Sequence, residues 1–182
     1  MKNFEMNGQE MRTPPHTALI KATKRIITLI VLHCTATSPD TSVEAIRKYW
    51  RNTLKWKQPG YHYIVKKNGE TVQLAPTDRI VNGVRGHNAH AIHVAYIGGT
   101  KTDGHGRQTA ADTRTQAQRA ALRSLVERLH RSFPKALILG HRDLSPDLNH
   151  NGRIEPGERI KACPCFDATD EYRDLNGPAK HA

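Results

Sequence analysis

The chain has 182 residues, of which 37% are hydrophobic and 25% are charged. That length suits one domain with a packed core, and the apolar content argues against wholesale disorder. Mean hydropathy is −0.66, and no apolar run approaches the about 20 residues that a membrane-spanning helix needs. Lys and Arg number 28 against 17 Asp and Glu, which gives a formal net charge of +11.

The charge is unevenly distributed along the sequence. Residues 141–182 hold 6 basic and 8 acidic side chains, net −2, whereas residues 1–140 hold 22 basic and 9 acidic side chains, net +13. A basic surface attracts polyanions, among them a bacterial envelope, although the same charge also serves solubility. The hypothesis that the protein binds nucleic acid rests on charge alone, because no binding motif is present and only 5% of residues are aromatic. We therefore expect no nucleic-acid partner.

The cysteines and the N-terminal segment indicate where the protein is made. Cys34, Cys163 and Cys165 are too few for a disulfide framework, which favours a reducing compartment and thiols that are free for metal or packing. The first residues include acids and lack the apolar stretch of a secretory signal. We expect synthesis in the cytoplasm without a signal peptide, so another process must release the protein to any target outside.

The N-terminal third of the sequence predicts an arm, a buried strand and a helix. Residues 1–25 are polar and aperiodic and are expected to form a flexible basic arm. Residues 26–33 form a short run rich in β-branched side chains, which is typical of a strand buried on both faces. Thr41 and Glu44 form a capping-box pattern at the start of a helix that runs through Trp50.

The middle of the sequence predicts a hairpin and a further strand. Residues 61–67 and 70–74 flank Asn68-Gly69, a strong hairpin signal. Residues 92–97 predict another strand, and residues 100–112 a polar loop.

The C-terminal third predicts a long helix, a last buried strand and a short closing helix. Thr113 and Gln116 give a second capping-box pattern before the long helix. Residues 136–140 form the last strand, and residues 166–175 the closing helix. Because strands and helices interleave, we expect an α/β fold: one domain over residues 26–176, with a central mixed sheet flanked by helices, and a tail at 177–182.

Two histidines occupy equivalent positions. His33 and His141 each follow a short, very apolar strand, and strand ends are where α/β sheets present functional groups. Together with Cys163 they would suit Zn²⁺, with a fourth position left for water. The spacing fits no local zinc-finger pattern, so structural histidines and a buried cysteine remain the alternative at this point.

Three segments in order carry a family resemblance: Val31-Leu32-His33-Cys34-Thr35-Ala36-Thr37, Gly60-Tyr61-His62-Tyr63-Ile64-Val65-Lys66 and Lys161-Ala162-Cys163-Pro164-Cys165-Phe166. Together they resemble the type 2 N-acetylmuramoyl-L-alanine amidases. The sequence is most similar to phage lysozymes of amidase type, which share their fold with animal peptidoglycan recognition proteins. The likeness covers roughly residues 26–175.

The resemblance implies a role for five side chains. His33, His141 and Cys163 match the zinc ligands of the family, Tyr61 its active-site tyrosine and Lys161 the active-site lysine of the phage enzymes. The implied site is a zinc cleft at the strand ends that hydrolyses the amide between N-acetylmuramic acid and L-alanine. A Lewis-acidic Zn²⁺ and a cationic or hydroxyl donor for the oxyanion suit that reaction. No residue stands out as general base.

The loop before residues 92–97 departs from the family. His87 and Asn88 are candidate substrate-binding residues. Family members often read Asn-x-x-Ser-Ile-Gly where this chain runs from Asn88 to His93, and a histidine of that loop is replaced near Val84. His87, His90 and His93 recur every three residues, which we interpret as solvated or stacking rings and not as a metal site.

A second departure is the insertion at residues 146–159. Residues 147–158 match the twelve-residue EF-hand loop, with Gly152 at its sharp turn. This pattern predicts a Ca²⁺ site with five ligands: Asp147, Asn149, Asn151, Arg153 and Glu158. The alternative is an Asn/Gly-rich turn whose acids face water.

Together these features predict a monomeric phage or prophage endolysin that acts on peptidoglycan once it reaches the cell wall. One alternative is a cytoplasmic amidase that recycles anhydro-muropeptides. Those relatives more often use Asp as third ligand, so Cys163 argues against it. Another is a non-catalytic peptidoglycan-recognition module, which would be expected to lack a zinc ligand.

Overall fold

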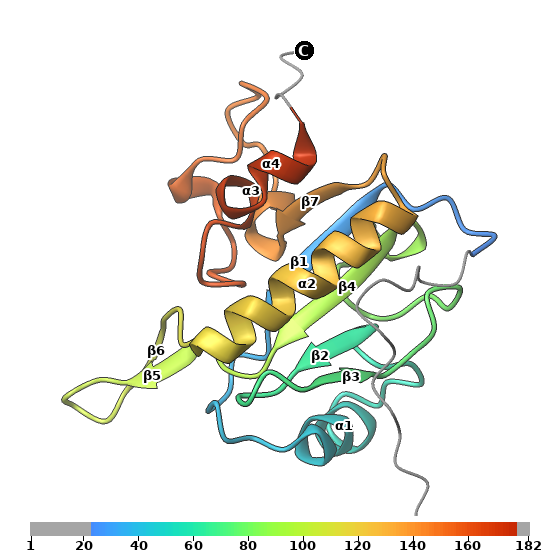
Figure 1. Ribbon diagram of the computed structural model, residues 1–182. Helices are drawn as coiled ribbons and strands as arrows, with labels where there is room; N and C mark the ends of the chain where they lie inside the picture. The colour runs from blue at the N-terminus through green and yellow to red at the C-terminus, as the bar shows by residue number, and fades with distance from the viewer. Residues whose placement is uncertain (1–22, 178–182) are drawn as a thin grey trace, which may run out of the picture.

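The computed structural model describes residues 23–177. The domain is built around a five-stranded sheet (Figure 1). The strands of this sheet are β1 (Leu29–Cys34), β2 (Tyr63–Val65), β3 (Thr71–Gln73), β4 (Ala91–Tyr96) and β7 (Leu137–Gly140). They lie in the order β3-β2-β4-β1-β7. β1 is parallel to β4 and β7, β4 is parallel to β2, and β3 is antiparallel to β2. The predicted mixed sheet is confirmed.

Helices cover both faces of the sheet. The helices are α1 (Val43–Asn52), α2 (Gln116–Ser132), α3 (Ala168–Glu171) and α4 (Arg173–Asn176). α2 lies across one face (Figure 1), where Leu122 and Leu125 pack on Ile30 and Leu32 of β1. α1 covers the other side and packs its Ile46 with neighbouring apolar residues of β2 and β4. Each fully buried aliphatic side chain contributes roughly 1.5–3 kcal/mol, so the sheet is a rigid base for its strand ends.

Both long helices form as predicted, but each begins later than its sequence pattern indicated. The N-cap of α1 is Ser42, whose Oγ accepts the N–H of Ala45 at 3.1 Å, and not Thr41. The capping box of α2 consists of Thr115 and Gln118, two residues beyond the predicted pair. The Thr and Gln residues of this segment form two overlapping capping-box patterns, and tertiary contacts determine which one caps the helix.

The contact that decides the second case involves Thr113. Its hydroxyl accepts the N–H of Gly99 at 2.8 Å and so ties this turn to the end of β4. Next to it, the guanidinium of Arg114 is buried and binds both Asp112 and Glu171, at 2.9 and 2.8 Å. These bonds join the start of α2 to α3.

The prediction of a polar loop over residues 100–112 is wrong for six of these residues. They form a second, two-stranded sheet of β5 (Thr100–Thr102) and β6 (Gln108–Ala110), which projects from the body (Figure 1). In the turn, the carboxylate of Asp103 accepts the N–H groups of His105 and Arg107, both at 2.9 Å. The strands are polar and largely exposed, so the sequence carries no alternating apolar signal for them.

The two ends of the domain also differ from expectation. The single closing helix predicted for 166–175 is two short helices, α3 and α4. Arg25, which the predicted arm includes, is bound to the domain, and residues 1–22 of the predicted arm lie outside the described residues. The Arg25 guanidinium donates to carbonyl oxygens of Thr77, Arg79, Asn88 and Ala91, at 2.6–2.9 Å. None of the helices within residues 23–177 combines the length with the apolar character that a membrane-spanning helix requires.

Candidate metal centre and active site

Three side chains that are far apart in the sequence meet at one edge of the sheet. His33 lies near the C-terminal end of β1, His141 directly follows β7, and Cys163 lies on the loop before α3. One ligand atom from each can be chosen so that all three atoms lie within 4.8 Å of one another. The two imidazole rings are 4.9 Å apart, and Nδ1 of His33 is 3.8 Å from the Cys163 sulfur. The structure therefore brings together the three predicted ligands.

Backbone contacts hold the Cys163 loop against the strand ends. The N–H of Arg142 donates to the carbonyl of Cys163 at 2.8 Å, and the N–H of Cys34 donates to its sulfur at 3.3 Å. A Cβ at Gly140 would lie 2.6 Å from Cδ of Pro164, closer than real Cβ contacts come. Glycine before His141 is thus what lets this loop approach β7.

The site keeps its imidazoles neutral. Burial, followed by the charges of the neighbouring histidines and of Lys161, places the pKa of His33 well below its ordinary value. Burial, and then the Lys161 ammonium, lowers the pKa of His141 to about 4. At neutral pH both rings therefore present a lone pair, the form that binds a metal ion.

The donor set determines which metals fit. Two neutral imidazoles and one sulfur suit Zn²⁺ and other borderline cations, whereas Ca²⁺ and Mg²⁺ prefer oxygen ligands. Three protein ligands leave a fourth tetrahedral position for water or substrate. Since the cluster also faces an open cleft, the residues present fit a catalytic zinc.

The cleft has a volume of about 450 Å³, and all three side chains line it, with His33 buried at its base and the other two partly exposed. Trp50, Trp56 and Tyr61 line it, and so do residues 108–110 of β6. The Tyr61 ring lies 5.1 Å from that of His33, and its hydroxyl donates to the carbonyl of Cys34 at 3.4 Å. Burial raises the pKa of Tyr61 above its ordinary value, so its hydroxyl keeps the proton and acts as a donor.

Lys161 also lines this cleft, from its exposed rim. Its charge lowers the pKa of both His33 and His141. The structure thus places a cation beside the three ligands, as the resemblance implied.

His87 and Asn88 lie elsewhere. Neither is among the side chains that line the cleft. The Asn88 amide oxygen accepts the N–H of Val84 at 2.7 Å, which fixes the turn before β4. A role of these two residues in substrate binding stays a prediction.

The EF-hand-like loop is closed by its first and last acidic residues. The buried carboxylate of Glu158 accepts three backbone N–H groups at 2.8–3.1 Å, those of Leu148, Asn149 and Glu155. These bonds lower its pKa. The Asp147 carboxylate accepts the N–H of Gly152 at 2.7 Å. The amide oxygens of Asn149 and Asn151, both exposed residues, accept the backbone N–H groups of Asn151 and Arg153.

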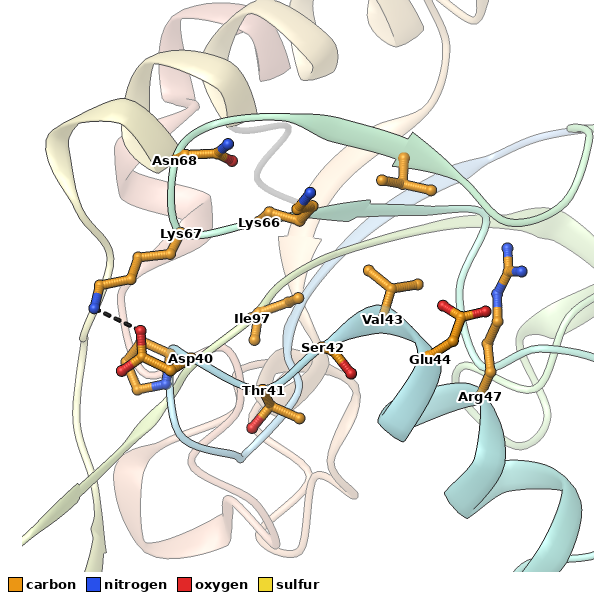
Figure 2. Close-up of a pocket in the computed structure, with 12 residues that line it drawn as sticks. Asp40, Thr41, Ser42, Val43, Glu44, Arg47, Lys66, Lys67, Asn68 and Ile97 are labelled. Atoms are coloured by element: carbon orange, nitrogen blue, oxygen red, sulfur yellow. Dashed lines mark hydrogen bonds and ion pairs between the residues drawn. The ribbon is translucent and has the colours of Figure 1, made fainter. Parts of the chain in front are cut away.

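A different hollow, of about 590 Å³, lies between the start of α1 and the β2–β3 hairpin (Figure 2). An ion pair between Lys67 and Asp40 crosses it at 2.7 Å. None of the predicted site residues lines it. Although this hollow is larger, the side chains suited to hydrolysis lie in the cleft.

Comparison with known proteins agrees with this geometry. The family model described as N-acetylmuramoyl-L-alanine amidase matches residues 5–164. The chain belongs to the type 2 N-acetylmuramoyl-L-alanine amidases. The amidase is therefore an enzyme whose substrate is peptidoglycan, and its family is typically metal-dependent.

Relatives of the amidase include phage proteins named endolysin. That of Enterobacteria phage K11 is 30% identical over 153 residues, which cover 82% of this chain and 89% of that one. That of Escherichia phage T7 is 33% identical over 141 residues, covering 76% and 80%. Among solved structures, the Ph2119 endolysin from a Thermus scotoductus bacteriophage matches with a TM-score of 0.60 at 25% identity, covering 87% and 88%.

The sequence did not identify every residue at the amidase site. Among the three spaced histidines, His93 was interpreted as solvated or stacking. It does stack on His62, with ring centroids 6.0 Å apart, but it is fully buried and not solvated. Its Nδ1 lies 3.0 Å from Nε2 of His33. On parallel β1 and β4 the two rings share a face, which becomes visible only once the strand register is known.

Proposed function

We propose that the amidase is zinc-dependent and serves as the endolysin of a phage or prophage, with His33, His141 and Cys163 as its zinc ligands. Its reaction is hydrolysis of the amide between N-acetylmuramic acid and L-alanine in the cell wall. The observation that carries the proposal is the convergence of the three side chains, within 4.8 Å, in an open cleft.

The residues around the cluster have separate tasks. When bound, Zn²⁺ supplies a Lewis acid for the scissile carbonyl and lowers the pKa of water to about 7. Lys161, at the rim, stabilises the negative charge that develops on the amide oxygen. Tyr61, which keeps its proton, offers a second donor once its hydroxyl turns away from the carbonyl of Cys34, and its ring packs against His33.

The proposed substrate is polymeric peptidoglycan. A glycan with peptide stems needs an open groove, and the cleft is lined both by Trp50 and Trp56 and by residues of the β5–β6 hairpin. Residues 26–176 would then form one catalytic domain, with 146–159 as an insertion. The names of the phage relatives support action at the cell wall.

The test combines metal analysis with mass spectrometry of digested sacculi. We expect about one zinc per chain and release of stem peptides with a free L-alanine amine, both lost in His141→Ala. A matched control is His130→Ala, which changes a histidine in the last turn of α2, away from the cleft. Release of those peptides by metal-stripped protein would contradict zinc dependence.

The choice of substrate separates an endolysin from a recycling enzyme. An endolysin should degrade intact sacculi, whereas a recycling amidase should prefer soluble anhydro-muropeptides. Activity on soluble fragments alone would contradict the proposed role.

We also propose that the basic surface attracts the enzyme to the anionic envelope. Salt screens such attraction, with a Debye length of about 10 Å at 0.1 M. Raised salt should therefore slow lysis of cells more than cleavage of a soluble muropeptide. Equal effects on both reactions would contradict this contribution.

The loop at 147–158 is proposed as a Ca²⁺ site. Its support is the ligand pattern of the sequence, from Asp147 to Glu158. Ca²⁺ should raise the melting temperature of the zinc-loaded protein, and Glu158→Ala should remove that rise. Glu44→Ala, an exposed acid at the start of α1, is the control. Identical melting with Ca²⁺ and with a calcium-selective chelator would contradict the proposal.

A further inference from the structure

A second buried histidine lies directly behind the metal cluster. His93 on β4 is fully buried, and its Nδ1 lies 3.0 Å from Nε2 of His33, which is itself buried. In the parallel β1–β4 pair, His93 is opposite Val31, so His93 and His33 point to the same face of the sheet, two residues apart in register. This contact is outside the set of three ligands.

The positions of the protons follow from how His33 must bind a metal. Its Nε2 is engaged with His93, and its Nδ1 is 3.8 Å from the Cys163 sulfur. Nδ1 is therefore the metal-binding atom and must be free of a proton. The proton of the neutral ring then sits on Nε2 and is donated to Nδ1 of His93. In the reverse arrangement His33 would carry its proton on Nδ1, which blocks the metal.

The surroundings of His93 hold its ring in place. Its backbone N–H donates to Nδ1 of His62 at 3.0 Å, and the two rings stack with an interplanar angle of 18°. On another side, a Cβ at Gly83 would lie only 2.2 Å from Cγ of His93. The ring thus fills a space that exists because residue 83 is glycine.

We propose that His93 is a positioning residue for the metal centre. It accepts the Nε2–H of His33 and thereby fixes the tautomer and the ring orientation in which Nδ1 faces the metal. Such partners of metal-bound histidines are usually carboxylates, carbonyls or water, and their loss typically weakens metal binding about 10–100-fold. Here the partner is a neutral imidazole. The inference rests on the proposed zinc site.

A further consequence is that the other nitrogen of His93 carries a proton without a partner. His93 Nε2 has no hydrogen bond within residues 23–177. This assignment makes a direct observation possible. In the zinc-loaded wild type, ¹⁵N NMR of the histidine rings should show Nε2 protonated in both His33 and His93. A proton on Nδ1 of His93 would overturn the proposal without any variant.

Two substitutions separate the hydrogen bond from the packing. His93→Asn places an amide oxygen near the position of Nδ1 and keeps an acceptor, whereas His93→Phe keeps a ring and removes it. Ile92→Val, a buried neighbour on the opposite face of β4, controls for general weakening of the strand. Affinity for Zn²⁺ is measured by competition with a chromophoric chelator, on variants shown by circular dichroism to be folded.

We expect His93→Phe to weaken zinc binding about 10–100-fold, His93→Asn to restore most of the loss and Ile92→Val to match the wild type. In the Co²⁺-substituted protein, His93→Phe should shift the d–d bands and keep the charge-transfer band of Cys163. Wild-type affinity and an unchanged cobalt spectrum in His93→Phe would overturn the inference. If His33→Ala bound zinc as tightly as the wild type, the result would contradict the proposed zinc site itself.

Discussion

The buried ring of His62 should make the stability of the domain sensitive to acid. His62 is fully buried, its Nδ1 accepts the N–H of His93, and its Nε2 donates to the carbonyl of Arg79 at 2.9 Å. A second proton would have to sit on Nδ1, against the N–H of His93. Burial first, and then the nearby Arg25 guanidinium, lowers the pKa of His62 to about 4, although its bond to Arg79 acts the other way.

The size and direction of the effect follow from proton linkage. The unfolded chain takes up the proton near pH 6.5, whereas the folded protein takes it up only near pH 4. Between these values the unfolded state binds more protons, so stability falls as the pH is lowered through this window and is constant above it. The full shift corresponds to about 3 kcal/mol, of which about 2 kcal/mol is lost between pH 8 and pH 5.

The assay is urea unfolding followed by tryptophan fluorescence at pH 8 and pH 5, with a chelator present so that metal release does not contribute. Other buried histidines add to the wild-type loss, so the informative quantity is the difference from His62→Gln, which should lose about 2 kcal/mol less on acidification. Ile138→Val, in the buried core, should cost about 1 kcal/mol at both pH values and leave the difference unchanged. Equal losses in wild type and His62→Gln would show that His62 is not the source of the acid sensitivity.

Three further substitutions test the site and its support. Lys161→Ala should lower kcat about 10²–10³-fold with zinc content unchanged, measured on soluble muropeptide; an unaltered kcat would remove Lys161 from the mechanism. Arg114→Met should lower the free energy of unfolding by about 3 kcal/mol, because two carboxylates lose a buried partner; a loss under about 1 kcal/mol would contradict this. Gly83→Ala should displace the ring of His93, lower the free energy of unfolding by about 1–3 kcal/mol and weaken zinc binding. Wild-type stability and wild-type zinc affinity would show that the structure accommodates the added methyl group without cost.

Most of the sheet was predictable because its signals are local. The β-branched run at β1 and the Asn68-Gly69 turn act within a few residues, and both led to the observed strands. Helix starts were less certain, since Thr113 and Thr115 both offer a cap and only the distant Gly99 decides between them. The β5–β6 hairpin has no apolar face and escaped detection for that reason.

The candidate site was predictable in its residues and not in its contacts. The family motifs predicted His33, His141 and Cys163 as metal ligands, and the structure brings these three side chains together. The partner of His33 depends on the register of β1 against β4 and on the space left at Gly83, neither of which leaves a local pattern. In the sequence, His93 is therefore not distinguishable from His87 and His90, which recur at the same spacing.

In the proposed metal centre, two imidazole nitrogens and one sulfur hold a single zinc ion. X-ray absorption at the zinc edge of the purified protein tests it most directly. We expect one sulfur at about 2.3 Å and nitrogen ligands at about 2.0–2.1 Å, with one light atom left over for water. A coordination shell of oxygen and nitrogen alone, without sulfur, would contradict it.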